Sequence, residues 1–298
     1  MSVALFTHPD CLRHDTGPGH PEQPARLAAI LAMAVQAPGV AVVESAAAPI
    51  ELLLAVHSAA HLALLESTSA DGGGAVSLDT VMGPESWRAV LGATGAGLAA
   101  LGHAHAGLGH AFAAVRPPGH HALASRAMGF CLVNNVVVLA RAGQSMGRHR
   151  VLIVDWDVHH GNGTQALVEH DATIRYVSLH QHPWYPGTGM AHERGVGNVF
   201  NVPRGPDLPP ERYVNDLWQA VAAATDGWIP DLVLHSAGFD AMAGDPLGGF
   251  TLRAEDYADL TLRLRTRLPA VPIVALLEGG YIPARLAEGV RACLGALA

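Results

Sequence analysis

The stretch Val151-Leu-Ile-Val-Asp-Trp-Asp-Val-His159 joins four consecutive apolar residues to a run in which acidic and imidazole side chains alternate with apolar ones. Four apolar residues without polar alternation predict a strand that is buried on both faces, as in a parallel sheet. Asp155, Asp157 and His159 are two residues apart, so in extended backbone their side chains project to the same side. Two carboxylates and an imidazole that converge at a strand end favour a bound cation, and zinc accepts both oxygen and nitrogen ligands.

Apolar runs of the same kind recur along the chain, and helical patterns lie between them. The further strand candidates are Val3–Thr7, Ala111–Val115, Ile174–Leu179, Leu232–His235 and Ile273–Leu277, beside Val151–Val154 itself. The helix candidates are Ala25–Val35, Ser58–Glu66, Pro84–Leu101, Leu132–Met146, Gly163–His170, Pro210–Thr225, Arg253–Arg267 and Pro283–Leu297. Pro84, Pro210 and Pro283 are expected in first helical turns. The alternation predicts a single α/β domain over residues 1–298, with a mainly parallel central sheet flanked by helices.

Chemically reactive residues are concentrated just after the strand candidates. The loops concerned are Arg116–His121, Asp155–Thr164, His180–Gly189, Ser236–Gly249 and Glu278–Tyr281. In an open parallel sheet, ligands bind outside the carboxyl ends of the strands. The five loops therefore predict one shared site.

Composition narrows the class of protein. The net charge is −8, all 18 basic residues are arginine, and they form no cluster, so direct binding to nucleic acid is not expected. Cys11, Cys131 and Cys293 form neither a disulfide framework nor a CxxC zinc site, which fits a reducing compartment. The chain shows no signal-peptide pattern and no apolar run long enough to span a membrane. We expect a cytoplasmic protein that is not bound to a membrane.

Each reactive segment also allows a less specific interpretation. The Asp155–His159 cluster fits a cap for the helix expected near Gly163. Asp240 is placed to add a third metal ligand, although an Asp after a strand is more often a turn residue. His120 and His121, held by a Pro-Pro-Gly turn, offer a general base, but also a metal-ligand or structural pair. Tyr281, after two glycines, can donate to an oxyanion, but a lone Tyr is more often a packing residue.

Taken together, these segments resemble the zinc-dependent histone deacetylases and the acetylpolyamine amidohydrolases, in the class II-like branch that includes bacterial members. The matching stretches, in the family's order, are His20–Leu27 (HPEQPARL), Arg116–His121, Gly129–Cys131, Asp155–Thr164, Tyr185–Gly189, Ser236–Asp240, Ala243–Pro246 and Glu278–Tyr281. The resemblance implies the arginase- and deacetylase-like α/β fold.

The resemblance also implies a role for each matching residue. Asp157, His159 and Asp240 would bind one catalytic zinc ion. His121 would be the general base, oriented by Asn162, which stands where class I enzymes have Asp. His120, paired with Asp155, would assist electrostatically, and Tyr281 would polarise the amide carbonyl.

The remaining implied roles concern the substrate tunnel and a structural ion. Phe130 and Tyr185 would form tunnel walls, Gly129 would contribute backbone, and Leu247 would stand at the mouth, where polyamine-preferring relatives have Glu. A structural potassium ion is expected near main-chain carbonyls and a hydroxyl of Asp155, Asp157, His159, Ser178 and Leu179.

The implied activity is hydrolysis of the acetyl or short acyl group from an acylated lysine in a protein or peptide. The nearest alternative is a deacetylase for acetylpolyamines or another small acetylated amine. A ureohydrolase of the arginase type shares the fold layout but uses a two-metal manganese cluster. A binder of acylated ligands without catalysis is the alternative outside enzymes, and the presence of Tyr281, His121 and all three zinc ligands argues against it.

Overall fold

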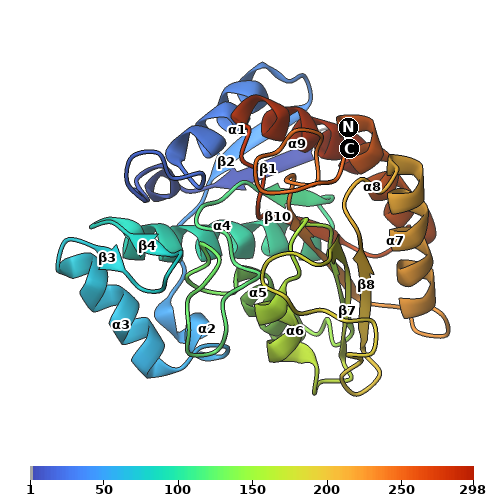
Figure 1. Cartoon of the computed structure of the whole chain (residues 1–298), viewed down its shortest axis with the longest axis horizontal. Helices are drawn as coiled ribbons and strands as arrows, with labels where there is room; N and C mark the ends of the chain where they lie inside the picture. The colour runs from blue at the N-terminus through green and yellow to red at the C-terminus, as the bar shows by residue number, and fades with distance from the viewer. Residues whose placement is uncertain (1–2) are drawn as a thin grey trace.

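The apolar runs form a central sheet of eight parallel strands in a computed structural model that describes residues 3–298 (Figure 1). In chain order the strands are β1 (Val3–Thr7), β2 (Val40–Glu44), β5 (Ala111–Ala113), β6 (Val151–Asp155), β7 (Ile174–Gln181), β8 (Val199–Arg204), β9 (Leu232–Ala237) and β10 (Ile273–Leu277). Across the sheet the order is β2-β1-β5-β10-β9-β6-β7-β8, and every neighbouring pair is parallel. The α/β fold predicted from the sequence is confirmed.

Helices cover both faces of this sheet. The helices are α1 (Pro24–Gln36), α2 (Ile50–Leu54), α3 (Ala59–Ala70), α4 (Ser86–His105), α5 (Asn135–Ser145), α6 (Asn162–Val168), α7 (Pro210–Ala224), α8 (Ala254–Arg267) and α9 (Pro283–Leu297), with a 3₁₀ turn at Pro9–Leu12. One layer packs α4, α5 and α6 side by side, and the other packs α1, α9, α8 and α7 (Figure 1). Both layers bury apolar side chains against the strands. Within residues 3–298, no helix has both the length and the apolar character needed to cross a lipid bilayer.

Two strands of the central sheet were not predicted, and both lie at its edges. β2 has intermediate or exposed residues throughout, and β8 alternates buried with half-buried positions and contains Pro203. An edge strand is paired on one side only, so it tolerates polar residues and proline that a central strand excludes. The β8 sequence, VFNVPR, lacks the continuous apolar run that identifies the central strands, whereas β2, VAVVE, has four apolar residues in a row and was missed all the same.

Two helix starts differ from the predictions by more than one residue. Pro84 lies before α4, which begins at Ser86, so its expected place in a first turn is wrong, whereas Pro210 and Pro283 do begin α7 and α9. The helix predicted from Leu132 begins at Asn135, because the Asn134 side chain accepts a hydrogen bond from the N–H of Val137 and caps it. A short antiparallel pair, β3 (Gly74–Ala75) with β4 (Val81–Met82), was also not predicted.

A buried ion network fixes the HPEQPARL segment to the sheet. The Glu22 carboxylate accepts hydrogen bonds from Arg116 at 2.5 and 2.8 Å and from Arg26 at 2.9 Å, and His14 Nε2 lies 3.4 Å away. All four side chains are at most 1% exposed. Burial raises the pKa of Glu22, but Arg116, His14 and Arg26 together hold it well below its ordinary value. Glu22 is therefore the counter-charge that keeps two arginines inside the protein.

Glu22→Gln should lower the free energy of unfolding by about 3–5 kcal/mol, since removing one member of a buried ion pair leaves its partners uncompensated. Urea denaturation at neutral pH measures this. Glu85→Gln is the matched control: its partner Arg88 is 62% exposed, so the loss should stay below about 1 kcal/mol. Because the folded pKa of Glu22 is lowered, its contribution is present above about pH 4.3 and is lost as the pH falls further, so the two proteins should converge in acid. Equal losses in both variants at pH 7 would contradict this account.

Candidate active site

Five adjacent strands carry the residues singled out from the sequence. β5, β10, β9, β6 and β7 are neighbours in the sheet, and the loops after them hold, respectively, the His pair, Tyr281, Asp240, the Asp155–His159 run and Tyr185. The strands are parallel, so all these loops leave the same edge. The structure thus brings the separate sequence motifs into one place.

Three buried side chains form a group with metal-ligand geometry. His159 Nδ1 lies 2.9 Å from Asp157 Oδ1 and 3.2 Å from Asp240 Oδ2, and these ligand atoms lie within 4.8 Å of one another. Asp240 Oδ2 is buried without a hydrogen-bond partner. A polar atom in that position is satisfied by a bound cation, and two carboxylates with one imidazole are a donor set that divalent metals accept.

The capping alternative for this cluster is wrong. Helix α6 begins at Asn162, and the N–H groups of Asn162, Thr164 and Gln165 donate to main-chain carbonyls instead of to these side chains. The carboxylates point instead toward one another, in a space kept open by two glycines. A Cβ atom on Gly238 would lie 2.1 Å from Asp157 Oδ2, and one on Gly279 would lie 2.0 Å from Asp240 Oδ2. Only glycine fits at these two positions while the carboxylates keep their places.

The charges of the group compensate one another. Burial and the neighbouring Asp157 raise the pKa of Asp240 to about 7. Burial lowers the pKa of His159, but the neighbouring carboxylates of Asp157 and Asp240 outweigh that effect and raise it to about 10. In the protein alone, the His159 proton supplies the positive charge that the carboxylates need. A metal ion would displace that proton.

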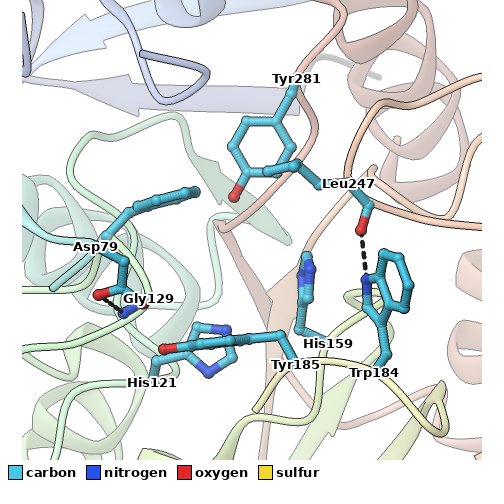
Figure 2. A pocket seen from close by; sticks show the side chains of 9 residues that line it. Asp79, His121, Gly129, His159, Trp184, Tyr185, Leu247 and Tyr281 are labelled. Carbon is cyan, nitrogen blue, oxygen red and sulfur yellow. Dashed lines mark hydrogen bonds between the residues drawn. The ribbon is translucent and has the colours of Figure 1, made fainter.

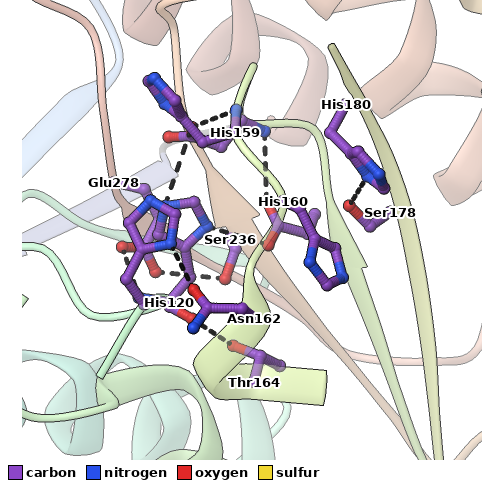
Figure 3. Close-up of polar contacts among 12 residues, drawn as sticks. His120, His159, His160, Asn162, Thr164, Ser178, His180, Ser236 and Glu278 are labelled. Carbon is purple, nitrogen blue, oxygen red and sulfur yellow. Dashed lines mark hydrogen bonds and ion pairs between the residues drawn. The ribbon is translucent and has the colours of Figure 1, made fainter. Parts of the chain in front are cut away.

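The two histidines of the pair have different partners. His120 Nδ1 lies 3.1 Å from Asp155 Oδ2, which also accepts the Tyr176 hydroxyl at 2.9 Å. His121 Nδ1 lies 2.8 Å from the Asn162 side-chain oxygen. That oxygen can only accept, so Nδ1 carries the hydrogen and Nε2 is left as a proton acceptor. Figure 3 shows His120 and Asn162 within this network of polar contacts.

These partners give the pair opposite protonation states. Burial lowers the pKa of His120, but Asp157 and Asp155 outweigh it and hold the pKa well above its ordinary value. Burial and the neighbouring His120 and His159 hold the pKa of His121 well below its ordinary value. His121 is therefore neutral and able to accept a proton, beside a cationic His120.

Glu278 holds the main chain of the His120–His121 pair in place, a role that was not predicted from the sequence. Its carboxylate accepts the N–H of Gly119 at 2.6 Å, the N–H of His120 at 3.1 Å and the Ser236 hydroxyl at 3.1 Å (Figure 3). Its side chain also lies with those of His120 and Cys131 in a second buried group of metal-ligating atoms. Three hydrogen-bond donors already occupy the carboxylate, so it serves as an anchor between the His pair and β9.

The potassium ion expected nearby stays a prediction. Asp155 of β6 lies beside Ser178 of β7 in register. His180 Nε2 donates to the Gly189 carbonyl, so His180 Nδ1 accepts from the Ser178 hydroxyl at 2.9 Å. The lone pairs of that hydroxyl are then free to face a cation. Ser178 and Leu179 are both fully buried, as an interior ion requires.

A narrow cavity of about 240 Å³ leads to this group. Its walls include every expected tunnel residue, and Figure 2 shows the Tyr281 hydroxyl pointing into it. The lining residues are Asp79, His121, Gly129, Phe130, His159, Trp184, Tyr185, Leu247 and Tyr281. Burial holds the pKa of Tyr281 well above its ordinary value, so the hydroxyl keeps its proton and can donate.

The backbone at the tunnel wall is unusual. Phe130 has a backbone φ of 66°, which residues other than glycine rarely adopt, and Gly129 has a φ of 57°. A Cβ atom on Gly129 would lie 2.3 Å from the His121 ring. The main chain therefore passes directly over His121, and the turn presents the Phe130 ring 5.9 Å from that of Tyr281. Such strained residues are concentrated at functional sites.

Two wall residues were missed by sequence reasoning. Asp79, between β3 and β4, accepts the Gly129 N–H at 3.1 Å, and Trp184 donates its indole N–H to the Leu247 carbonyl at 2.7 Å (Figure 2). Asp79 stands in Ser77-Leu-Asp-Thr80, which matches no known motif, so the sequence offered no reason to single it out. Trp184 directly precedes the Tyr185-Pro-Gly-Thr-Gly189 stretch. Its position next to the expected tunnel residue Tyr185 could have identified it as a further wall residue.

The histone deacetylase domain family matches residues 20–297. A histone deacetylase-like amidohydrolase of Pseudomonas aeruginosa is 33% identical over 309 residues, which cover 94% of this chain and 81% of that protein. The chain belongs to the histone deacetylase family. Membership makes it a hydrolase of the deacetylase and amidohydrolase type, in place of the ureohydrolase alternative.

Two solved structures share the fold of this chain. The HDA15 HD domain is 36% identical, with a TM-score of 0.95, and the match covers 99% of this chain and 90% of that one. An acetylpolyamine aminohydrolase from Burkholderia pseudomallei is 26% identical, with a TM-score of 0.90, and the match covers 99% and 98%. The structural neighbours of this chain thus include both the HDA15 HD domain and an acetylpolyamine aminohydrolase.

Zn²⁺ binding at pH 7.5 should release about one proton per ion, since the imidazole ligand must be deprotonated and the pKa of His159 lies at about 10. Calorimetric titration in two buffers of different ionisation enthalpy measures the release. Asp240→Asn should abolish tight binding, whereas Asp216→Asn, a buried carboxylate paired with Arg204 and Arg212, should leave binding unchanged. Full metal content in Asp240→Asn would remove that residue from the site.

Proposed function

We propose that the chain is a zinc-dependent amidohydrolase that removes acetyl or other short acyl groups from acylated lysine side chains. The observation that carries this is the meeting of three groups at one narrow cavity. They are the buried Asp157–His159–Asp240 ligand set, the neutral His121 and the hydroxyl of Tyr281.

Asp157, His159 and Asp240 would hold the ion. Zinc bound there would act as a Lewis acid toward the amide carbonyl and would lower the pKa of a water molecule. Two anionic ligands offset part of the charge of the ion, which makes a separate base useful. The family and the donor set support zinc, and metal analysis of the purified protein tests it.

His121 is the residue suited to move protons. Its Nε2 is the open acceptor and its ring lines the cavity, so it can take a proton from the attacking water. The same proton then passes to the leaving amine. Acetate and the free amine are the products. His120, charged and paired with Asp155, supplies a fixed positive field beside it.

Tyr281 is the residue suited to stabilise the oxyanion. Its hydroxyl is protonated and points into the cavity (Figure 2). Below it, the Arg26 guanidinium lies 4.9 Å from the ring centroid and donates to the Gly280 carbonyl at 2.6 Å. A donor that is fixed before the reaction costs no reorganisation when charge develops on the carbonyl oxygen.

The shape and polarity of the cavity favour an acyl-lysine. Phe130 and Tyr185 line it with aromatic rings, and Leu247 and Trp184 add further apolar surface. The aliphatic stem of lysine matches such a channel, because each buried methylene contributes about 0.8 kcal/mol. Leu247 places no charge where a protonated polyamine would need one.

Asp79 favours a second candidate, a deacetylase for acetylpolyamines or another small acetylated amine. It lines the same cavity, and although burial raises its pKa, hydrogen bonds from Ser77, Tyr185 and Thr80 lower it below the ordinary value. A carboxylate that stays ionised would attract a cationic amine. Three donors already share its Oδ1 atom, which reduces the charge left for a ligand.

His121→Ala should lower kcat by about 10²–10⁴-fold, the usual contribution of general acid–base catalysis. His120→Ala should cost less, because His120 is assigned no proton transfer. Steady-state kinetics on an acetyl-lysine peptide, with metal content measured in each preparation, makes the comparison. A larger loss in His120→Ala at equal metal content would reverse the assignment.

The wild-type kcat/KM should be higher for acyl-lysine peptides than for acetylspermidine or acetylputrescine, because the rim is apolar at Leu247. Leu247→Glu should shift the ratio toward the acetylpolyamines, and Leu247→Gln is its uncharged control. The kcat/KM ratio of the two substrate classes is the measurement. A wild-type preference for acetylpolyamines over every peptide would promote the second candidate.

A further inference from the structure

Three hydrogen bonds connect the rim of the cavity to the main chain of Tyr281. The Trp184 indole N–H donates to the Leu247 carbonyl at 2.7 Å. The Leu247 N–H donates to Asp245 Oδ1 at 3.0 Å, and the Tyr281 N–H donates to Asp245 Oδ2 at 2.7 Å. Trp184 is 45% exposed, whereas Asp245 is 7% exposed. The connection thus runs from solvent to the interior, and Figure 2 shows Trp184, Leu247 and Tyr281 around one side of the cavity.

The backbone around these contacts has little stiffness of its own. Gly280, with φ 114°, precedes Tyr281, and Gly244, with φ 83°, precedes Asp245. Glycine has the largest conformational freedom of any residue, so it does not fix the direction of the residue that follows. Arg26 holds one side of the Tyr281 loop through the carbonyls of Gly280 and Glu278. The N–H of Tyr281, on the side toward the rim, is held by Asp245.

Carboxylate chemistry suits this double role. Asp245 uses one oxygen for each loop, so a single side chain sets the distance between the Leu247 and Tyr281 main chains. Asparagine keeps the shape but offers one accepting oxygen, and its NH₂ group would face an N–H donor. Two accepting oxygens, one for each N–H, are therefore what Asp245 supplies and asparagine does not.

We infer that Asp245 is a positioning residue that acts through Tyr281, and that it links the seating of substrate against Trp184 and Leu247 to the place of the Tyr281 hydroxyl. The inference rests on the proposed function, which gives that hydroxyl its role. A substrate that fills the rim stabilises the Leu247 loop, and through Asp245 the same contact stabilises the reactive position of Tyr281. Asp245 itself does not touch the reacting atoms.

A double-mutant cycle tests the inference on the full chain, loaded with zinc, with an acetyl-lysine peptide. Tyr281→Phe should lower kcat by about 10²–10³-fold, as for loss of one oxyanion donor. Asp245→Asn should lower kcat by up to about 10²-fold, with KM within a few fold, since misplacement of a catalytic group by about 1 Å has that effect. In the Tyr281→Phe background, Asp245→Asn should cause no further loss. Asp216→Asn, at a buried carboxylate that does not line the cavity, should keep the wild-type kcat.

Amide hydrogen exchange gives a readout that does not depend on activity. In Asp245→Asn, the amides of Leu247 and Tyr281 should exchange faster than in the wild type, with and without Zn²⁺, whereas Asp216→Asn should leave them unchanged. Where Asp245→Asn does not fold, Trp184→Phe at the exposed end replaces it, and it should speed Leu247 exchange and lower kcat only when the Tyr281 hydroxyl is present.

The outcomes separate the two ideas. Loss in Tyr281→Phe together with a non-additive cycle supports the inference. Loss in Tyr281→Phe together with full activity of Asp245→Asn, or with additive losses, overturns the inference and leaves the proposed function standing. An unchanged kcat in Tyr281→Phe overturns the proposed role of the hydroxyl and the inference with it.

Discussion

Two buried carboxylates, those of Asp157 and Asp240, lie beside each other with His159 between them, and the surrounding structure is arranged to tolerate this charge. Placing ions in the interior costs several kcal/mol each unless they are compensated. Main-chain N–H groups provide much of the compensation: Gly279 donates to Asp157 at 2.9 Å and Val158 to Asp240 at 2.8 Å. At Gly238 and Gly279 the backbone passes so close to the carboxylates that a Cβ atom would not fit. Such close approach also requires loops that leave one edge of the sheet, which the parallel strands supply.

Compensation of buried charge also distinguishes the two histidines. His120 has a carboxylate partner and is cationic, whereas His121 has an amide partner and is neutral, although their rings are only 4.0 Å apart. Two adjacent imidazoles in a buried site cannot both be positively charged without a large cost in free energy. Asn162 therefore has a consequence beyond orientation: an Asp there would pull His121 toward the charged state. The amide keeps a proton acceptor available next to the candidate metal ligands at neutral pH.

The central strands and the reactive loops were predictable because their signals are local. An apolar run identifies a strand buried on both faces, and Asp157, His159, Asp240 and Tyr281 follow such runs directly. The edge strand β8 lacks that run, since it is paired on one side only, and β2 has the run but is largely exposed. Asp79 and Asp245 could not be assigned, because their importance lies in contacts with residues far along the chain. The N–H of Tyr281, for instance, is 36 positions from Asp245.

This division also separates chemistry from substrate choice. The groups assigned to bond cleavage stand at the ends of central strands, where packing on both faces limits their movement. The rim comes from irregular segments, the β3–β4 turn with Asp79, the loop with Trp184 and the loop with Leu247, which can change without disturbing the sheet. A histone deacetylase domain and an acetylpolyamine aminohydrolase can therefore share this fold closely. The physical link between the two parts is the small number of side chains, such as Asp245, that hydrogen-bond to both.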